Sequence, residues 1–289
     1  IEANFVPTDD KVRLVDELSE CGFAKIEVTS FTSPKAIPML RDAEEVMGRI
    51  TRVPGVEYTV LVPNLRGAER AFESKADEFN LVMSVSETHN QSNLRMSRAD
   101  SAKALGEVIS LAHQSKVAVN ISLSTSFGCP MSGMTPTHEL MHWIDHFVDQ
   151  GVRGISICDT TGMANPRQVT EICEQAQSKY PNMQWTLHFH NTRGMGLANA
   201  LAAVQAGIVR FDSSLGGLGG CPYAPGATGN ICTEELVHML DLMGFKTHMN
   251  LDLLLECAAD LRTLVDRPLP SQVLLAGKVD RLYDKICQS

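Results

Sequence analysis

The sequence has 289 residues, with 25 Lys and Arg against 34 Asp and Glu, a formal net charge of −9, 44% hydrophobic residues and 20% charged residues. This composition disfavours an intrinsically disordered chain, and the length fits one large domain or two modest ones. The sequence contains no run of about 18 apolar residues, so no membrane-spanning helix is predicted. The excess of acidic residues argues against non-specific nucleic-acid binding.

The eight cysteines form no C-x-x-C pair, and their spacing matches neither a zinc site nor a disulfide framework. Free thiols are typical of a reducing compartment, so we expect a cytoplasmic protein whose cysteines are mostly core residues.

Strand-like and helix-like patterns alternate along the whole chain. Helices are expected at 9–20 (with Thr8 as N-cap), 39–50, 65–74, 101–115, 135–151 (with Pro136 in its first turn), 166–179, 197–206 and 233–243, and again from 251 onward. Strands are expected between them at 23–29, 58–62, 78–85, 117–123, 154–158, 185–189 and 208–213.

This alternation predicts parallel βαβ units, each about 30 residues long. We interpret it as a (β/α)8 TIM barrel spanning residues 1–289, with a helical extension from about residue 250. Because the pattern opens on a helix, the first strand is expected upstream of Ile1. An open doubly wound sheet is the alternative, although no G-x-G-x-x-G follows the first strand.

Polar residues follow every predicted strand, at the end where barrels of this type place their active sites. They include acids, imidazoles, hydroxyls and amides, which together predict a functional cluster: Glu27, Ser30, Asn64, His89, Ser124, Asp159, His188, His190 and Asp212.

The segment His188-Phe189-His190 is the sharpest local signal. Residues i and i+2 of a strand point the same way, so both imidazoles can face one ion. The alternative is a pair of hydrogen-bonded histidines at a strand end. Zinc would need a third strong ligand, whereas nearby carboxylates and amides favour a six-coordinate ion such as Mg2+ or Mn2+.

Residues 216–230 contain six glycines with one thiol, Cys221, near their centre. They lack the G-K-[ST] of a phosphate-binding loop. Because so many glycines permit a mobile backbone, we interpret the segment as a lid, with a plain linker as the alternative. A second metal-like pattern, His138-Glu139-Leu140-Met141-His142, spells H-E-x-x-H. It falls on an outer helix away from the strand ends, and we interpret it as a solvated helix face.

Five segments resemble 3-hydroxy-3-methylglutaryl-CoA lyases, a family of metal-dependent enzymes on (β/α)8 barrels. They are IEVTSFTSPK from Ile26, LVPNLRG from Leu61, CDTTG from Cys158, HFHNTRG from His188 and GLGGCPYAPGATGN from Gly217. The last is highly specific for this family, whereas the H-x-H alone is shared with isopropylmalate and homocitrate synthases and with hydroxy-oxovalerate aldolases.

The resemblance implies a retro-Claisen cleavage of the acyl-CoA thioester to acetyl-CoA and acetoacetate, and a homo-oligomer, either a dimer or a tetramer. It implies His188, His190 and Asn230 as metal ligands and Cys221 as a thiol in proton transfer. Asp159, Glu27 and Glu234 match acidic positions near the family's site. Ser30, Asn64, His89, Ser124 and Glu234 are candidate substrate contacts.

Family members also carry an Arg-Asp pair on the first strand, which supplies a metal ligand and a stabiliser of the enolate. We expect that pair upstream of Ile1. Three hypotheses therefore stand: a lyase acting on this thioester or on a related 3-hydroxy-3-substituted acyl-CoA, a sister aldolase or Claisen-type synthase acting on 2-oxo acids, and an inactive truncated form.

Overall fold

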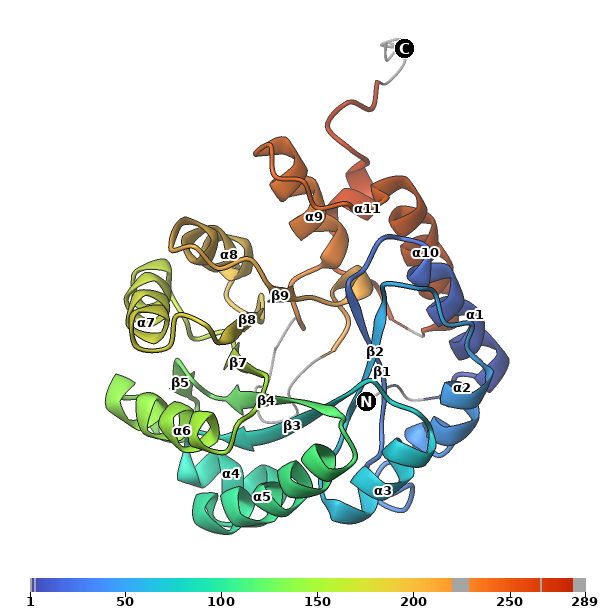
Figure 1. The fold of residues 1–289 in the computed structure, drawn as a ribbon. Coiled ribbons are helices and arrows are strands. Elements are labelled where there is room, and N and C mark those ends of the chain that lie inside the picture. The colour runs from blue at the N-terminus through green and yellow to red at the C-terminus, as the bar shows by residue number, and fades with distance from the viewer. Residues whose placement is uncertain (1, 3, 220–228, 266, 283–289) are drawn as a thin grey trace.

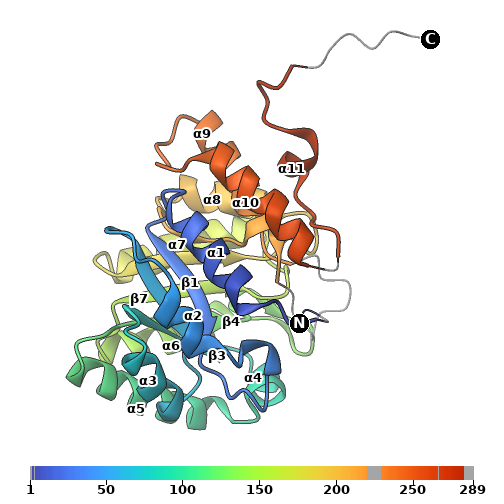
Figure 2. The same cartoon turned by 90° about the vertical axis from the view of Figure 1, so that its right-hand side faces the viewer.

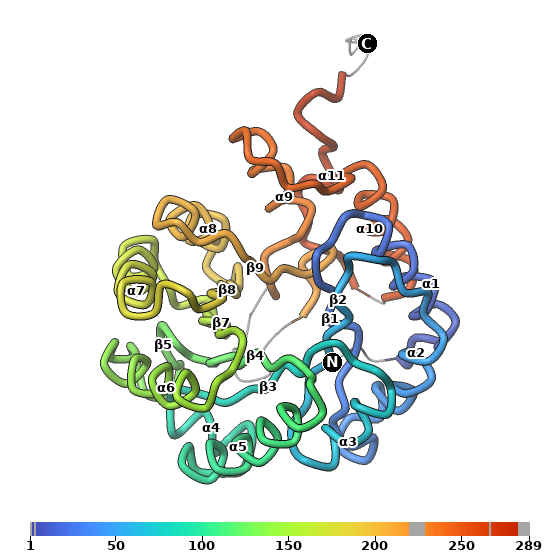
Figure 3. Tube along the Cα trace, in the orientation of Figure 1, coloured from blue at the N-terminus to red at the C-terminus, as the bar shows by residue number. Residues whose placement is uncertain are grey.

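A curled parallel sheet forms the centre of the molecule, with helices around its outer face (Figures 1 and 3). The computed structural model describes residues 2, 4–219, 229–265 and 267–282. Within these residues the sheet has seven strands, all parallel and ordered as written: β1 (Lys25–Ser30), β2 (Glu57–Leu61), β3 (Glu78–Ser84), β4 (Ala118–Ser124), β7 (Gly154–Asp159), β8 (Gln184–Phe189) and β9 (Phe211–Asp212).

The helices lie along the outside of the sheet; α2 to α8 connect successive strands, α1 precedes β1, and α9 to α11 follow β9. They are α1 (Thr8–Ser19), α2 (Ala43–Arg49), α3 (Leu65–Glu73), α4 (Glu87–Leu94), α5 (Arg98–Gln114), α6 (Thr137–Asp149), α7 (Pro166–Lys179), α8 (Gly196–Gln205), α9 (Thr233–Leu242), α10 (Leu251–Leu264) and α11 (Gln272–Ala276). Two 3-10 turns at Pro38–Leu40 and Leu215–Gly217 and a small hairpin of β5 (Gly128–Cys129) and β6 (Gly133–Met134) complete the described elements.

The strands alternate between two buried faces, as β3 illustrates. Phe79, Leu81 and Met83 are fully buried in the apolar layer between the sheet and the helices. Asn80 points the other way, into the barrel, where it meets side chains of β1 and β4. Because all strands are parallel, their carboxyl ends lie at one end of the barrel, and polar side chains that follow them converge there.

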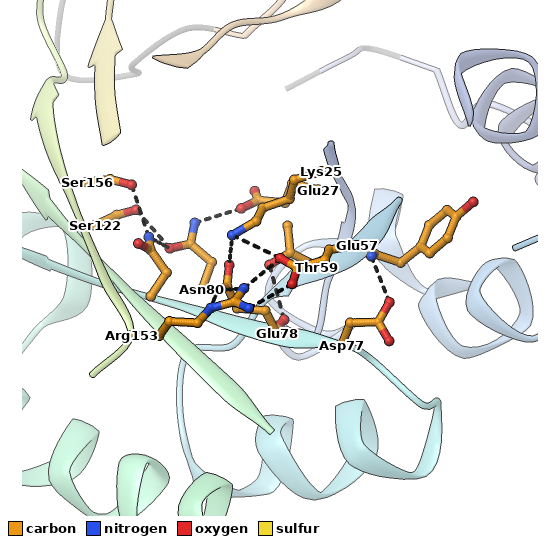
Figure 4. A network of polar contacts seen from close by, with 12 residues as sticks. Lys25, Glu27, Glu57, Thr59, Asp77, Glu78, Asn80, Ser122, Arg153 and Ser156 are labelled. Carbon is orange, nitrogen blue, oxygen red and sulfur yellow. Dashed lines mark hydrogen bonds and ion pairs between the residues drawn. The ribbon is translucent and has the colours of Figure 1, made fainter. Parts of the chain in front are cut away.

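Ion pairs close the opposite end, where the strands begin (Figure 4). The Glu78 carboxylate is only 2% exposed and pairs with both Lys25 and Arg153. Arg153 also binds Glu57 through two nitrogen–oxygen contacts of 2.7 and 2.6 Å. These contacts tie β1, β2, β3 and the start of β7 together at their amino ends.

The extension that follows α9 packs on the barrel (Figure 2). Leu254 and Cys257 of α10 lie in one apolar cluster with Cys21 and Val237. Leu261, Val265 and Leu269 pack with Leu215 and Leu218, which lie just before and within the start of the glycine-rich segment. These contacts support our proposal that residues 1–289 form one barrel domain with a helical extension from about residue 250.

The predicted barrel fold and the order of its seven strands are confirmed, whereas several local predictions were wrong. Helix α4 was not predicted, because Ser, Thr, Asn and Gln dominate it and give it no apolar stripe. Thr8 lies inside α1, whose N-cap is Pro7, and Pro136 caps α6 from outside, because the helix begins at Thr137.

Within the described residues no strand lies between β9 and β1, and the eighth strand expected upstream of Ile1 stays a prediction. No described helix combines the length and apolar character needed to cross a membrane.

Gly22, which follows α1, lies against the segment that leads into α10, so a substitution there tests how α1 and α10 pack together. Its φ is +97°, and a Cβ there would lie 2.2 Å from the backbone oxygen of His248, in the segment that leads into α10. We expect Gly22→Ala to lower the unfolding free energy by about 1–3 kcal/mol, through backbone strain and the steric conflict.

Gly48→Ala is the matched control, because Gly48 lies in α2 and a Cβ there meets no atom within 4 Å. It should stabilise the protein by up to about 1 kcal/mol. Chemical denaturation of the three proteins provides the measurement, and equal midpoints would contradict the proposed conflict at Gly22.

Candidate active site

Two histidines stand at the carboxyl end of β8 with their rings close together. His188 is the fifth residue of the strand and His190 follows its end, and the ring centroids are 5.3 Å apart. His190 also forms an antiparallel bridge with Asn230, supported by hydrogen bonds from Asn191 N to Gly229 O and from Ile231 N to Phe189 O. The structure therefore brings Asn230, some 40 residues further along the chain, next to His190 and its neighbour His188.

His190 and Asn230 each present a buried polar atom that has no hydrogen-bond partner among the described residues: the ring nitrogen Nδ1 and the amide oxygen Oδ1. The Asn230 amide is held by its nitrogen, which donates to Ser214 Oγ and to the Leu218 carbonyl, each at 2.8 Å. Burial and the neighbouring His188 lower the pKa of His190 to about 3, so this imidazole stays neutral. A neutral imidazole and an amide oxygen are both suitable donors to a divalent cation.

His188 lies in a different electrostatic environment. Burial is the largest single influence and lowers its pKa, but Asp212, whose Oδ2 lies 3.6 Å from His188 Nδ1, raises it. Glu27 and Asp159 add to that effect, and the net shift of the His188 pKa is upward. The sequence placed Asp212 at a strand end, but only the structure shows that it faces His188.

Asp159 ends β7 and is 2% exposed. Its Oδ1 accepts hydrogen bonds from the backbone nitrogens of Met163 and Ala164, at 2.7 and 3.0 Å. Burial raises the pKa of Asp159 to about 6, against the opposing effects of those two hydrogen bonds and of the His188 and Arg193 charges. The carboxyl group therefore titrates close to neutral pH.

Glu27 projects from β1 into the barrel, where solvent still reaches it. Its Oε2 accepts a hydrogen bond of 2.6 Å from Asn80 Nδ2. The surrounding barrel wall raises the pKa of Glu27 by desolvation, which the Asn80 hydrogen bond opposes, and Asp212 and His188 act on it in opposite directions. Glu27, His188, Asp159 and Asp212 thus form one coupled group of charges.

The first residue of the glycine-rich segment, Gly216, is held in place by a buried carboxylate. Glu234 is fully buried, and both of its carboxylate oxygens lie 3.1 Å from the backbone nitrogen of Gly216, which donates to them. Glu234 therefore fixes the turn at the start of the segment, a role that its sequence position did not indicate. Cys221, the predicted thiol of this segment, lies outside the described residues.

The other candidate contacts have local partners. Ser30 Oγ hydrogen-bonds Thr32 Oγ1 at 2.8 Å, and the Asn64 side chain caps α3 by accepting from Gly67 N at 3.0 Å. His89 is buried in α4, with Nδ1 2.6 Å from Ser84 Oγ, and Ser124 is buried at the end of β4. All four lie at or shortly after the carboxyl ends of strands, and their contact with substrate stays a prediction.

The H-E-x-x-H pattern lies on α6. The Glu139 carboxylate accepts a hydrogen bond of 2.7 Å from Arg98, while His138 and His142 are exposed. Among the described residues, no group of three or more His, Cys, Asp and Glu side chains is arranged to hold a metal ion. The pattern therefore occupies a solvated helix face, as its position in the sequence indicated.

Comparison with known proteins identifies the family. The model of the HMGL-like family matches residues 1–261. The chain belongs to the HMGL-like family. A hydroxymethylglutaryl-CoA lyase of Bacillus subtilis is 43% identical over 277 residues, covering 96% of this chain and 93% of the relative. The human mitochondrial hydroxymethylglutaryl-CoA lyase is 37% identical, with coverage of 95% and 85%.

Solved structures of the family agree with this fold. An HMG-CoA lyase from Acinetobacter baumannii, in complex with coenzyme A and 3-methylmalate, superposes with a TM-score of 0.94 at 48% identity, covering 98% of this chain and 93% of that one. The B. subtilis lyase structure gives a TM-score of 0.92 at 42% identity, with coverage of 95% and 92%.

The raised pKa of Asp159 generates a stability prediction. A carboxyl group whose pKa rises from 3.8 to about 6 on folding binds its proton more tightly in the native state, so the protein loses stability as pH rises through that range. The loss amounts to at most about 3 kcal/mol. With a metal chelator present, Asp159→Asn should be more stable than the wild type at pH 7 and similar to it below pH 4.

Denaturation curves between pH 4 and 7.5 provide this measurement. Asp149→Asn, on the exposed face of α6, is the control and should follow the wild-type curve. An Asp159→Asn variant that is less stable than the wild type at pH 7 would contradict the desolvation of this carboxylate.

Proposed function

We propose that this chain is a carbon–carbon lyase that cleaves 3-hydroxy-3-methylglutaryl-CoA, or a related 3-hydroxy-3-substituted acyl-CoA, to acetyl-CoA and a 3-oxo acid such as acetoacetate. The observation that carries the proposal is the group His188, His190 and Asn230 at the carboxyl end of β8. It occurs in a chain whose relatives of 43% and 48% identity, matched over nearly their whole lengths, are HMG-CoA lyases.

The donor set fits a divalent cation, for which we propose Mg2+ or Mn2+. The fit rests on two buried atoms without a hydrogen-bond partner in the described part of the chain, the ring nitrogen Nδ1 of His190 and the amide oxygen of Asn230, which would hold the ion together with His188. When bound, such an ion supplies Lewis-acid assistance, which acidifies the substrate's C3 hydroxyl and fixes its orientation.

The chain's own residues would handle the protons. Asp212 lies next to His188 and favours its protonated form, so the imidazole can take up the C3 hydroxyl proton as the C2–C3 bond breaks when its ring is not bound to the ion. Asp159 and Glu27 add negative charge that stabilises the imidazolium. The enolate of acetyl-CoA then needs a proton, and the family resemblance assigns its delivery to the Cys221 thiol.

One relative favours a wider substrate range. The A. baumannii lyase structure is a complex with coenzyme A and 3-methylmalate, a hydroxy dicarboxylic acid. We therefore include other hydroxyacyl-CoA thioesters among the substrates to be tested. Reactions of 2-oxo acids with acetyl-CoA test the alternative of a sister aldolase or synthase.

Incubation of the protein with 3-hydroxy-3-methylglutaryl-CoA and Mg2+ should release acetyl-CoA and acetoacetate. His188→Ala should lose at least about a hundredfold in kcat, because the group that receives the proton is removed. Coupled detection of acetyl-CoA provides the measurement. Turnover of 2-oxo acids without thioester cleavage would replace the lyase proposal with a synthase, and no turnover of any substrate would favour the inactive form.

The cation proposal has a test that is independent of turnover. A ligand that binds only the folded state stabilises it, by about 2.7 kcal/mol at a hundredfold excess over its Kd. We expect Mn2+ to raise the Tm of the wild type, and the increment to vanish in His190→Ala. His142→Ala on α6 is the matched control and should keep the Mn2+-dependent rise in Tm. If that rise were lost only in His142→Ala, the cation site would lie on α6 instead.

Two further proposals concern the setting of the protein. We propose a reducing compartment, the cytoplasm, because Cys21, Cys129, Cys158, Cys173, Cys232 and Cys257 are all free thiols. We also propose a dimer or tetramer, on the family resemblance alone.

A further inference from the structure

A row of polar side chains crosses the barrel interior between the ion pairs at the amino ends of the strands and the candidate active site (Figure 4). We call it the amide row. It joins residues from β1, β3, β4 and β7: Glu27, Asn80, Asn120, Ser122 and Ser156. The proposed reaction uses only one of them, Glu27.

The hydrogen bonds of the amide row fix the orientation of Asn80. Its Oδ1 accepts from Ser122 Oγ at 2.8 Å and from Asn120 Nδ2 at 3.0 Å. Its nitrogen Nδ2 therefore faces Glu27 Oε2, at 2.6 Å. An ionised carboxylate can only accept, so the amide cannot turn over without placing two oxygens face to face. The orientation of Asn80 is thus determined from both sides.

The far end of the amide row is equally well held. Asn120 Nδ2 also donates to Ser156 Oγ at 3.0 Å, and Asn120, Ser122 and Ser156 are all buried. Gly154 provides the necessary space, because a Cβ at that position would lie 2.8 Å from Asn120 Oδ1. Asn80 is therefore anchored on two neighbouring strands before it meets Glu27.

Glu27 is the most exposed member of the row, and its charge interacts with those of His188 and Asp212. The Asn80 contact occupies Oε2, which leaves Oε1 as the oxygen available to a bound molecule. A carboxylate on a flexible side chain next to a reaction centre loses effectiveness when it is not held in place. Asn80 supplies that restraint.

We propose that Asn80 is a positioning residue for the lyase reaction. It fixes the Glu27 carboxylate inside the barrel, on the side of His188 and Asp212, and acts only through Glu27. The inference rests on the proposed function in that it assigns Glu27 a part in the reaction.

A double-mutant cycle tests this inference. Asn80→Ala should lower kcat for thioester cleavage about ten- to hundredfold, with little change in KM, because one hydrogen bond to a charged group is lost. In a Glu27→Ala background the same substitution should change kcat less than about twofold, since no carboxylate remains to be positioned. Full additivity of the two substitutions would overturn the proposal.

Two further variants separate hydrogen bonding from packing. Asn80→Asp keeps the side-chain volume but replaces the donor with an acceptor, and it should lose at least as much kcat as Asn80→Ala. Asn182→Ala, on the exposed turn after α7, is the control and should leave kcat unchanged. An Asn80→Asp variant with wild-type kcat would show that only the volume at this position matters.

Crystal structures of the wild type and Asn80→Ala provide a readout without turnover. We expect the Glu27 carboxylate to leave its position or to lose its electron density in the variant, and an unmoved Glu27 would overturn the proposal. If the wild-type protein cleaves no thioester, the proposed function falls, whereas the position of Glu27 in the two crystals still decides whether Asn80 holds it.

Discussion

The buried carboxylate of Glu78 is the charge on which the arrangement of the barrel interior depends. An unpaired charge at 2% exposure would cost several kcal/mol, and Lys25 and Arg153 neutralise it from two different strands. These pairs set the relative positions of β1, β3 and β7 at their amino ends. Because inward side chains recur every two residues, the ion pairs, the amide row and the two histidines of the candidate site follow one another along the barrel.

Two histidines separated by one residue have opposite pKa shifts, and their surroundings explain the difference. His190 is buried away from carboxylates and next to another imidazole, so it stays neutral. His188 faces Asp212 and feels Glu27 and Asp159, so its protonated form is favoured. In the protein without a bound ion, one strand end therefore carries a neutral imidazole beside one that favours its proton, a difference that arises from environment alone.

The strand order could be predicted from sequence, and so could the strand end at which the candidate site residues lie, because apolar runs and the polar residues after them are local signals. The amide row could not. Asn80 and Asn120 lie inside strands, where a polar residue gives no sign of its partner, and only the β3–β4 register places them side by side. Glu234 matched a family position, yet its hydrogen bond to Gly216 depends on a turn 18 residues away. Helix α4 was missed because its sequence carries no apolar periodicity.

The absence of a side chain at Gly154 has a consequence for how this barrel can diversify. The Asn120 amide occupies the space that a Cβ at residue 154 would need, 2.8 Å from Asn120 Oδ1. A larger residue at 154 would require the Asn120 amide to shift or to be replaced, and this would disturb one of the two donors that hold Asn80. Substitutions at 154 and 120 are therefore expected to be coupled.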